Sequence, residues 1–462
     1  MHLPNDITSC HAIIKQLMEQ VQLLTARVAS LEAQVNQNSK NSHQPPSSDG
    51  PKKRPAFSKK GSKKRGGQKG HRGKTLEMVM HPHHTIIHQV ERCSCGQNLS
   101  RAPKYVSQRR QVFDLPVPCL EVTEHQQYSC ICPRCHKINV GVFPSQVVAP
   151  TQYGSGVRTL VVLLQTGLNV SYRKVRQFFT DLFDYQLNEA TQINTQDKCY
   201  ELLQSSEEVI QSSLLNSPVN HFDETGIRVA GNNHWLHNCS NDKFTYQFVH
   251  RRRGQVALDD PASLIPHYGG WAVHDCWSSY FKYKGCQHAI CAAHLLRELQ
   301  ALIEQDRSWA KRMQELLMYA YEQSDKGRGV AQNLQKIGRQ YDRICQMANQ
   351  EEPLPKQRYA NKRPKQTKGR NLLNRLVKYK SSVLAFAHYQ QVPFTNNQAE
   401  RDVRPTKTKI KVAGCFRTKK GADIYARIQS FISTTRKHQR NVFNELVAVF
   451  DGCSFLTAQI NC

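Results

Sequence analysis

The chain has 462 residues, 39% of them hydrophobic, and a formal net charge of +28. That length predicts two or three domains with cores large enough to need no disulfide bonds, and the excess of Lys and Arg favours a phosphate-rich partner, with nucleic acid ahead of an anionic membrane surface. The N-terminus lacks a signal-peptide pattern and no apolar run approaches the roughly 18 residues of a membrane span, so we expect no membrane partner and a reducing, cytoplasmic setting in which the sixteen cysteines hold metal or fill cores.

The first predicted element is a helix with a heptad pattern at residues 7–35. Apolar side chains recur at alternating steps of three and four, with β-branched residues on the a side and leucine at d. The pattern favours a parallel two-stranded coiled coil over residues 7–37, which would join chains into a homodimer or a higher oligomer. An amphipathic helix packed on its own chain is the alternative. The seam consists of Ile7, Cys10, Ile14, Leu17, Val21, Leu24, Val28, Leu31 and Val35.

Residues 38–75 are predicted to form a disordered, basic DNA-binding linker. Residues 51 to 74 contain eleven Lys or Arg and no Asp or Glu, and their glycines would let the backbone lie close to a duplex. A merely solvated tail is the alternative, so the pattern predicts phosphate binding without sequence preference. The residues expected to contact DNA are Lys63, Lys64, Arg65, Lys69 and Arg72.

Two close cysteine pairs lie within residues 76–145, which we expect to be a small zinc-binding β unit. Cys93 and Cys95 form a C-x-C, and Cys132 and Cys135 form a C-x-x-C beyond an alternating stretch that suggests a hairpin. Four thiolates in two pairs can surround tetrahedral zinc and stabilise a unit that lacks a core. Cysteines without metal are the alternative. Spare ligand candidates are Cys130, His136 and the histidines of "MHPHH".

Residues 150–216 are predicted to be helical, because apolar residues recur at helical spacing from Gly154 to about Leu215. Ser171 precedes "YRKVRQFF" as an N-cap precedes a helix, and basic residues lie on the open face of that helix. Such a helix pair suits a helix-turn-helix DNA-binding region. It suits plain packing in a helical bundle equally well.

An acidic residue follows an apolar run at the start of the next region. "VNHFDETGIRVAG", "HWLHNCS" and "FTYQFVH" alternate as strands of an antiparallel meander, and Asp223 projects from the first of them. A fourth strand, "GGWAVHDCW", ends in Asp275. Two carboxylates on neighbouring strands are costly to bury unpaired, so a shared cation is a natural partner.

A third carboxylate is expected from the helix in "PFTNNQAERDVRPTKTKIK". Thr395 or Asn396 can cap this helix, which would carry Glu400 in its second turn and be limited by Pro405. Two Asp and one Glu can hold two magnesium ions about 3.5 to 4 Å apart. Singly, each carboxylate also suits a turn, a cap or an ion pair; together they favour a site. Basic residues that would hold a phosphate backbone beside it are Arg401, Arg404, Lys407, Lys409 and Lys411.

The order and spacing of several stretches carry a resemblance over nearly the whole chain. These are "QNSKNSHQPPSSD", "KKRGGQKGHRGKT", the paired cysteines, "HFDETG", "HDCWSSY", "CAAHLLREL" and "NNQAERDVRP". The chain resembles the bacterial transposases of the insertion sequence 66 family. The resemblance implies a ribonuclease H-like catalytic domain, here residues 217–440, with Asp223, Asp275 and Glu400 as an acidic triad. It also implies a helical insertion, at about 300–390, and leaves residues 441–462 as a C-terminal tail.

The expected fold class is therefore multidomain α+β: an N-terminal coiled coil, a small zinc-binding β unit, a helical DNA-binding region and a ribonuclease H-like α/β catalytic domain with a helical insertion. The expected function is a magnesium-dependent transposase in the bacterial cytoplasm, associated with the nucleoid. It would bind the ends of a mobile element in double-stranded DNA, cleave them and join the freed 3′ hydroxyl to target DNA. A nuclease of the same fold that does not join, and a DNA-binding regulator with a vestigial site, are the alternatives. Helper proteins of the same element remain open as partners.

The stretch "CAAH", with Cys291 and His294, resembles a C-x-x-H motif of related transposases. On a helix the two side chains lie on one face. A second metal site and a structural helix contact both fit this spacing.

Overall fold

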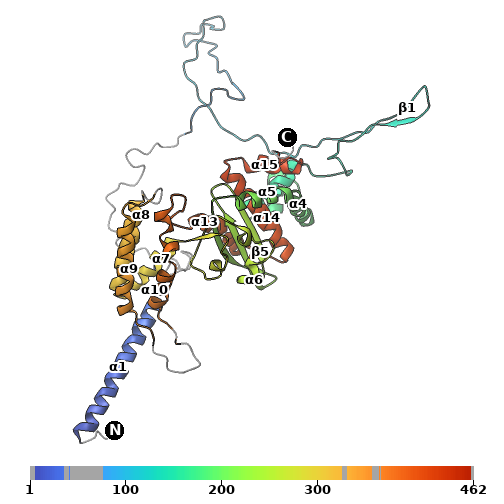
Figure 1. Cartoon of the computed structure of the whole chain (residues 1–462). Helices are drawn as coiled ribbons and strands as arrows, with labels where there is room; N and C mark the ends of the chain where they lie inside the picture. The colour runs from blue at the N-terminus through green and yellow to red at the C-terminus, as the bar shows by residue number, and fades with distance from the viewer. Residues whose placement is uncertain are drawn as a thin grey trace. The chain divides into compact units, whose positions relative to one another are not determined.

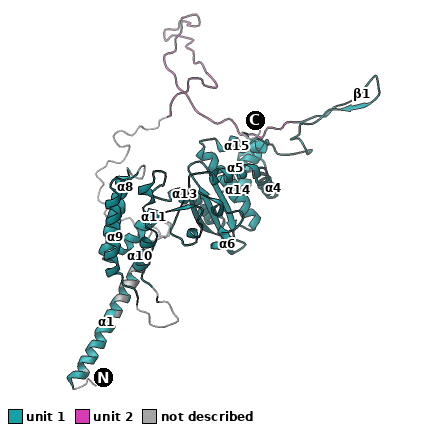
Figure 2. Cartoon of the chain, viewed as in Figure 1, with its two compact units in different colours: residues 1–50, 124–462 teal, residues 51–123 magenta. Residues whose placement is uncertain are grey.

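The computed structural model describes residues 6–35, 41, 76–324, 330–355, 364 and 366–458. The chain divides into two compact units, residues 1–50 with 124–462 and residues 51–123 (Figure 2). The basic residues predicted to contact DNA between Lys63 and Arg72 lie outside the described residues. Within the described part, no helix is long and apolar enough to cross a membrane.

The heptad pattern falls on a single helix, α1 (Ile7–Val35). Its apolar a and d side chains are exposed in the chain on its own, for example 53% for Leu17 and 58% for Leu24. A helix with its apolar stripe in water is marginal by itself, because most helical stability comes from burying such a face. Pairing with a second chain therefore stays a prediction.

The described part of residues 51–123 contains turns but no helix or strand. A turn at Cys93 and Cys95 is closed by a bridge between Arg92 and Asn98. The prediction of a hairpin between the cysteine pairs is wrong. The side chains there are almost all exposed, so strands in this stretch would have no apolar surface to pack against. A short hairpin instead flanks Cys132 and Cys135 themselves, formed by β1 (Ser129–Ile131) and β2 (Ile138–Val140).

A five-stranded mixed sheet lies in the larger unit, with the strand order β5-β4-β3-β6-β7. The antiparallel meander is as predicted, with a tight turn at Ala230 and Gly231, where both residues have positive φ. β6 runs parallel to β3, and β7, a strand that the sequence analysis missed, runs parallel to β6. The strands are β3 (Val219–Val229), β4 (Asn232–Ser240), β5 (Thr245–His250), β6 (Trp271–His274) and β7 (Gln287–Ile290).

Helices before and after the sheet share one core with it. Buried residues from the helices of 155–215, from the strands and from the last two helices form a single cluster. The domain boundary predicted at residue 216 therefore does not separate two packed units. Residues 441–462 were expected to be a tail, but Leu446 and Val449 are buried in this core. The helices are α2 (Ser155–Val162), η2 (Leu163–Gly167), α3 (Tyr172–Phe183), α4 (Glu189–Leu202), α5 (Gln204–Leu215), α13 (Asn397–Ala413), α14 (Lys419–Lys437) and α15 (Val442–Phe450).

A second core lies in the helical series between β7 and α13. Trp309, Leu317 and Tyr341 are buried at its centre, and α8 and α9 pack side by side (Figure 1). The series comprises α7 (Ala292–Ile303), α8 (Ser308–Gln323), α9 (Leu334–Glu351), α10 (Lys368–Lys378), α11 (Lys380–Val383) and α12 (Ala385–His388). Short helical turns between strands are α6 (Gln255–Leu258), η3 (Ile265–His267) and η4 (Tyr280–Lys282).

Candidate active site

β3 carries two successive carboxylates that face opposite sides of the sheet. Side chains alternate along a strand, so Asp223 shares a face with Ile227 and Glu224 shares a face with Phe222. Ile227 packs in a cluster with Val403 of α13, whereas Phe222 packs in the cluster on the other face. Asp223 therefore lies on the side of β3 that α13 covers, and α13 is the helix that carries Glu400.

Asp275 directly follows the carboxyl end of β6 and lies beside Asp223, which is in the middle of the parallel neighbour β3. In the β3–β6 pairing His221 is opposite Val273, so two residues further along Asp223 is level with Asp275. Burial raises the pKa of Asp223 well above its usual value, and the negative charges of Glu224 and Asp275 raise it further, whereas Lys407 opposes them. The arrangement thus concentrates negative charge that a bound cation would offset.

Glu224 already has protein partners on both of its carboxylate oxygens. Its side chain is 2% exposed and makes an ion pair of 2.5 Å with Arg253, while the hydroxyl of Tyr280 donates to its other oxygen at 2.8 Å. The guanidinium of Arg253 lies over the rings of Trp235 and Trp277, at 5.0 and 4.7 Å. Glu224 is therefore a structural neighbour of the site, and the sequence held no local signal for its partner in "RRRG".

Arg253→Met should lower the free energy of unfolding by about 1 to 3 kcal/mol, because the buried carboxylate of Glu224 loses its charged partner. We expect a smaller loss of stability than for a fully buried ion pair, since the Arg253 side chain is 41% exposed and water screens the interaction. Urea unfolding followed by tryptophan fluorescence measures the change. The double variant Glu224→Gln with Arg253→Met should recover most of the loss. An unchanged urea midpoint in the single variant would show that the pair does not stabilise the fold.

Asn396 joins the segments that carry the three acidic residues. Its buried side chain donates to the carbonyl of Phe222 at 2.8 Å, and its Oδ1 lies 2.8 Å from Nδ1 of His221, whose pKa burial lowers to about 4. Its backbone N–H donates to Sγ of Cys291 at 3.0 Å. The N–H of Cys291 in turn donates to the carbonyl of His274, the residue before Asp275, at 2.9 Å. A continuous hydrogen-bonded framework thus links the first turn of α13 to both aspartate-bearing strands.

Glu400 lies at the end of the first turn of α13, not in the second turn as expected. Its carboxylate is grouped with Cys291 and His294, the three ligand atoms lying within 4.8 Å of one another. Nε2 of His294 is 3.8 Å from Oε1 of Glu400. All three residues stand out in the sequence, but their spacing along the chain does not predict that they meet.

Comparison with protein families identifies the chain. The model described as Transposase IS66 family matches residues 150–424, more than half of the chain, and this match includes Asp223, Asp275 and Glu400. The chain belongs to the IS66 transposase family. The transposase is accordingly a phosphoryl-transfer enzyme that binds DNA, and its family implies divalent metal ions. A second model, for a family of unknown function, matches residues 3–77, and no curated protein matches the chain.

The basic residues of the transposase on α13 do not all have the same surroundings. Arg401, Arg404 and Lys407 are exposed along the helix. Lys409 is partly buried: its Nζ donates to the carbonyl of Gln165 at 3.2 Å, and burial lowers its pKa. The first three are thus free to meet a phosphate backbone, whereas Lys409 holds α13 against η2.

The expectation that Pro405 limits the helix is wrong, because α13 continues to Ala413. A proline in a helix interior costs about 3 kcal/mol through its missing N–H and its ring. Val403 and Thr406 are fully buried on either side of it, and Ile410 packs against the same cluster. This burial offsets the cost and keeps the basic side chains on one continuous helix.

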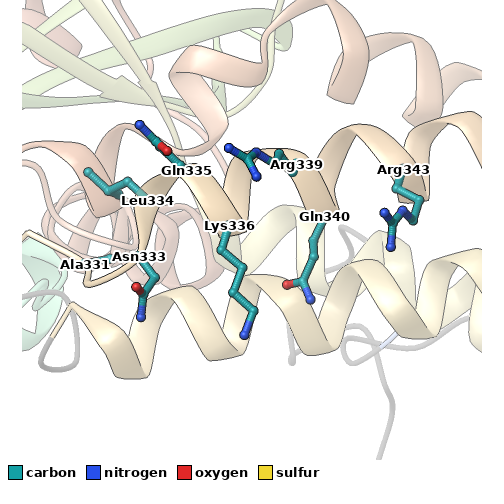
Figure 3. Close-up of a pocket in the computed structure, with 8 residues that line it drawn as sticks. All are labelled: Ala331, Asn333, Leu334, Gln335, Lys336, Arg339, Gln340 and Arg343. Carbon is teal, nitrogen blue, oxygen red and sulfur yellow. The ribbon is translucent and has the colours of Figure 1, made fainter.

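A pocket of about 640 Å³ lies along α9 and the turn before it (Figure 3). None of Asp223, Asp275 and Glu400 lines it. Its lining includes Lys336, Arg339 and Arg343 and no acidic side chain. It therefore offers no group for metal-dependent chemistry, although its charge suits an anion.

The predicted zinc ligands form two local pairs. Hydrogen bonds from the backbone and thiol of Cys95 lower the pKa of Cys93, and bonds from the backbone of Cys135 and Arg134 lower the pKa of Cys132. Within each pair the sulfur atoms are close enough to interact, which suits a thiolate pair. The pairs belong to different compact units of the chain.

Proposed function

We propose that this transposase cleaves the ends of a mobile element and joins the freed 3′ hydroxyl to target DNA, using Asp223, Asp275 and Glu400 as its catalytic triad. The observation that carries the proposal is that Asp275, directly after β6, is level with Asp223 of the neighbouring strand β3, whose Asp223 face is covered by the helix of Glu400. The raised pKa of Asp223 supports it, because uncompensated negative charge is what a metal site requires. The strand order β5-β4-β3-β6-β7 further supports a ribonuclease H-like fold.

Magnesium fits these residues, since carboxylate oxygens are its preferred protein ligands. Two such ions would activate the attacking oxygen and stabilise the leaving oxygen of the phosphodiester. The chain's own part is to fix the carboxylates: the sheet holds Asp223 and Asp275, and Asn396 ties the turn of Glu400 to β3. Arg253 and Tyr280 keep Glu224 paired, so that it does not compete for the cation.

The DNA interface in this proposal combines the basic linker with the exposed residues Arg401, Arg404 and Lys407. Lys407 already acts electrostatically on Asp223, which favours a phosphate position close to the carboxylates. On α3, Arg173, Lys174 and Arg176 are exposed while Val175 is buried, which supports a DNA-facing helix in the region of 150–216. Attraction to phosphate from such residues falls steeply with salt.

The test is incubation of the purified full chain with labelled duplexes that carry the element ends, in magnesium. Joined products support the transposase mechanism proposed here. Cut but unjoined products would favour the same-fold nuclease, and retarded but intact DNA would favour a regulator with a vestigial site. We expect short inverted repeats in the DNA that flanks the gene, and these would supply the end sequences.

We also propose that Cys93, Cys95, Cys132 and Cys135 bind zinc. Cys132→Ser should reduce the zinc content of the purified chain by one ion per chain, because structural zinc sites need all four ligands. Elemental analysis measures the change, with Cys119→Ser as a control at an exposed cysteine. Unchanged zinc after replacement of both Cys132 and Cys135 would refute the assignment.

A further inference from the structure

Cys291, His294 and Glu400 converge where the start of α7 meets the first turn of α13. One sulfur, one imidazole nitrogen and one carboxylate oxygen lie within 4.8 Å of one another. Cys291 is fully buried, while the side chains of His294 and Glu400 are 20% and 23% exposed. The group is thus close-packed but reachable by a small ion.

The donor set favours a thiophilic cation. Thiolate, imidazole and carboxylate are the ligands of zinc, and three of them with a fourth position open is a common zinc arrangement. Magnesium, in contrast, takes oxygen ligands and does not prefer sulfur. The chemistry of this group therefore differs from that of the Asp223–Asp275 pair.

Backbone N–H groups contact the buried sulfur of Cys291. The backbone N–H of Asn396 donates to its Sγ at 3.0 Å, and the N–H groups of His294 and Ala293, in the first turn of α7, also donate to it. Burial raises the pKa of the Cys291 thiol to about 11 and these donors oppose it only in part, but they fix the position of the sulfur as a ligand would require. A plain core cysteine needs no such donors.

Oε1 of Glu400 is an independent observation that points to a ligand. This oxygen is buried and accepts no hydrogen bond from any residue that the structure describes. Nε2 of His294 lies 3.8 Å from this oxygen, which is too far for a hydrogen bond. A buried carboxylate oxygen without a donor is costly, and a cation between Cys291, His294 and Glu400 would satisfy it.

We propose that Cys291, His294 and Glu400 bind one divalent cation of the zinc class, at a site separate from the Asp223–Asp275 pair. The site shares Glu400 with the proposed catalytic triad, but cation binding does not depend on the catalytic role of that residue. Binding replaces the thiol proton of Cys291, which is released to solvent as the sulfur–metal bond forms.

Cobalt(II) titration of the metal-depleted full chain tests the site, because cobalt replaces zinc and its sulfur-to-metal absorption band reports a bound thiolate. The Cys291→Ser variant should bind one equivalent of cobalt fewer than the parent, and the missing equivalent should be one that shows the thiolate absorption band. His294→Gln should bind that equivalent at least about tenfold more weakly, since even loss of an outer partner weakens metal binding about 10- to 100-fold. Cys345→Ser, which removes a buried thiol on α9, is the matched control and should bind cobalt as the parent does.

Asp223→Asn separates this inference from the proposed function. It should retain the cobalt equivalent even where it loses cleavage. Because His294 is only partly buried, the His294→Gln variant should keep the core intact. Its cobalt affinity therefore tests the site even if Cys291→Ser does not fold. The proposal is overturned if the His294→Gln variant binds cobalt as tightly as the parent does. It is also overturned if no cobalt equivalent with a thiolate band is lost when Cys291 is replaced. Either result leaves the cleavage reaction of Asp223 and Asp275 to be judged by its own experiment.

Discussion

Asp223→Asn should reduce strand cleavage and joining by at least about 100- to 1,000-fold, while affinity for DNA changes little. The substitution keeps the size and hydrogen bonding of the side chain but removes a charge from the centre where a metal is expected, and electrostatic groups of this kind contribute factors of that order. Affinity comes mainly from Lys and Arg and depends on salt, so one carboxylate contributes little to it. Strand cleavage and gel retardation on the same end fragment measure both quantities.

Stability provides a second readout for this variant. Burial and the charges of Glu224 and Asp275 disfavour the ionised form of Asp223, so replacing it with a neutral group should leave the protein no less stable. Loss of activity without loss of stability separates a chemical role from a structural one. Asp242→Asn, at an exposed carboxylate in the turn between β4 and β5, is the matched control.

Glu400→Gln should behave as Asp223→Asn does, in magnesium and again in manganese. If Asp223→Asn cuts at the parental rate, the triad is wrong at its first member. If only Glu400→Gln does so, the third ligand lies elsewhere and the pair of aspartates stands.

The strands that position the two aspartates were predictable, because the apolar pattern of a strand is visible in a short stretch of sequence. The alternation along β3 specifies a strand that carries Asp223, and the apolar run before Asp275 specifies a strand that this carboxylate follows; the register then brings the two level. β7 was missed because its four residues, Gln287–Ile290, are too few for a period to be recognised. The strand matters, since it extends the parallel part of the sheet directly before Cys291.

The framework that joins the site was not predictable from local patterns. Thr395 or Asn396 was expected to cap α13; Asn396 stands at the N-cap position, yet its side chain makes no cap bond and instead binds His221 and Phe222 of β3. These partners are about 175 residues away in sequence. Spacing along a helix or strand carries no information on such contacts, and the same holds for Arg253 and Glu224.

Replacing Leu17 and Leu24 with Ala should dissociate the oligomer that we propose for the transposase. In a paired seam each leucine at a d position fills a hole in the facing helix, and its loss costs about 2 to 5 kcal/mol. Against the residues that the structure describes, the two side chains are 53% and 58% exposed, so the substitutions remove little packing within a single chain. Sedimentation of the full chain at several concentrations measures the effect.

The control has to separate loss of the seam from loss of the helix. Alanine is the strongest helix former, so α1 itself should persist in the double variant. Lys15→Ala with Gln22→Ala changes the same helix outside the seam and should sediment like the parent, because neither position is an a or a d. If the Leu17 and Leu24 variant also sediments like the parent, the exposed stripe of α1 does not join two chains. A fall in mass confined to the leucine variant, in contrast, ties self-association to the apolar face that the single chain leaves in water.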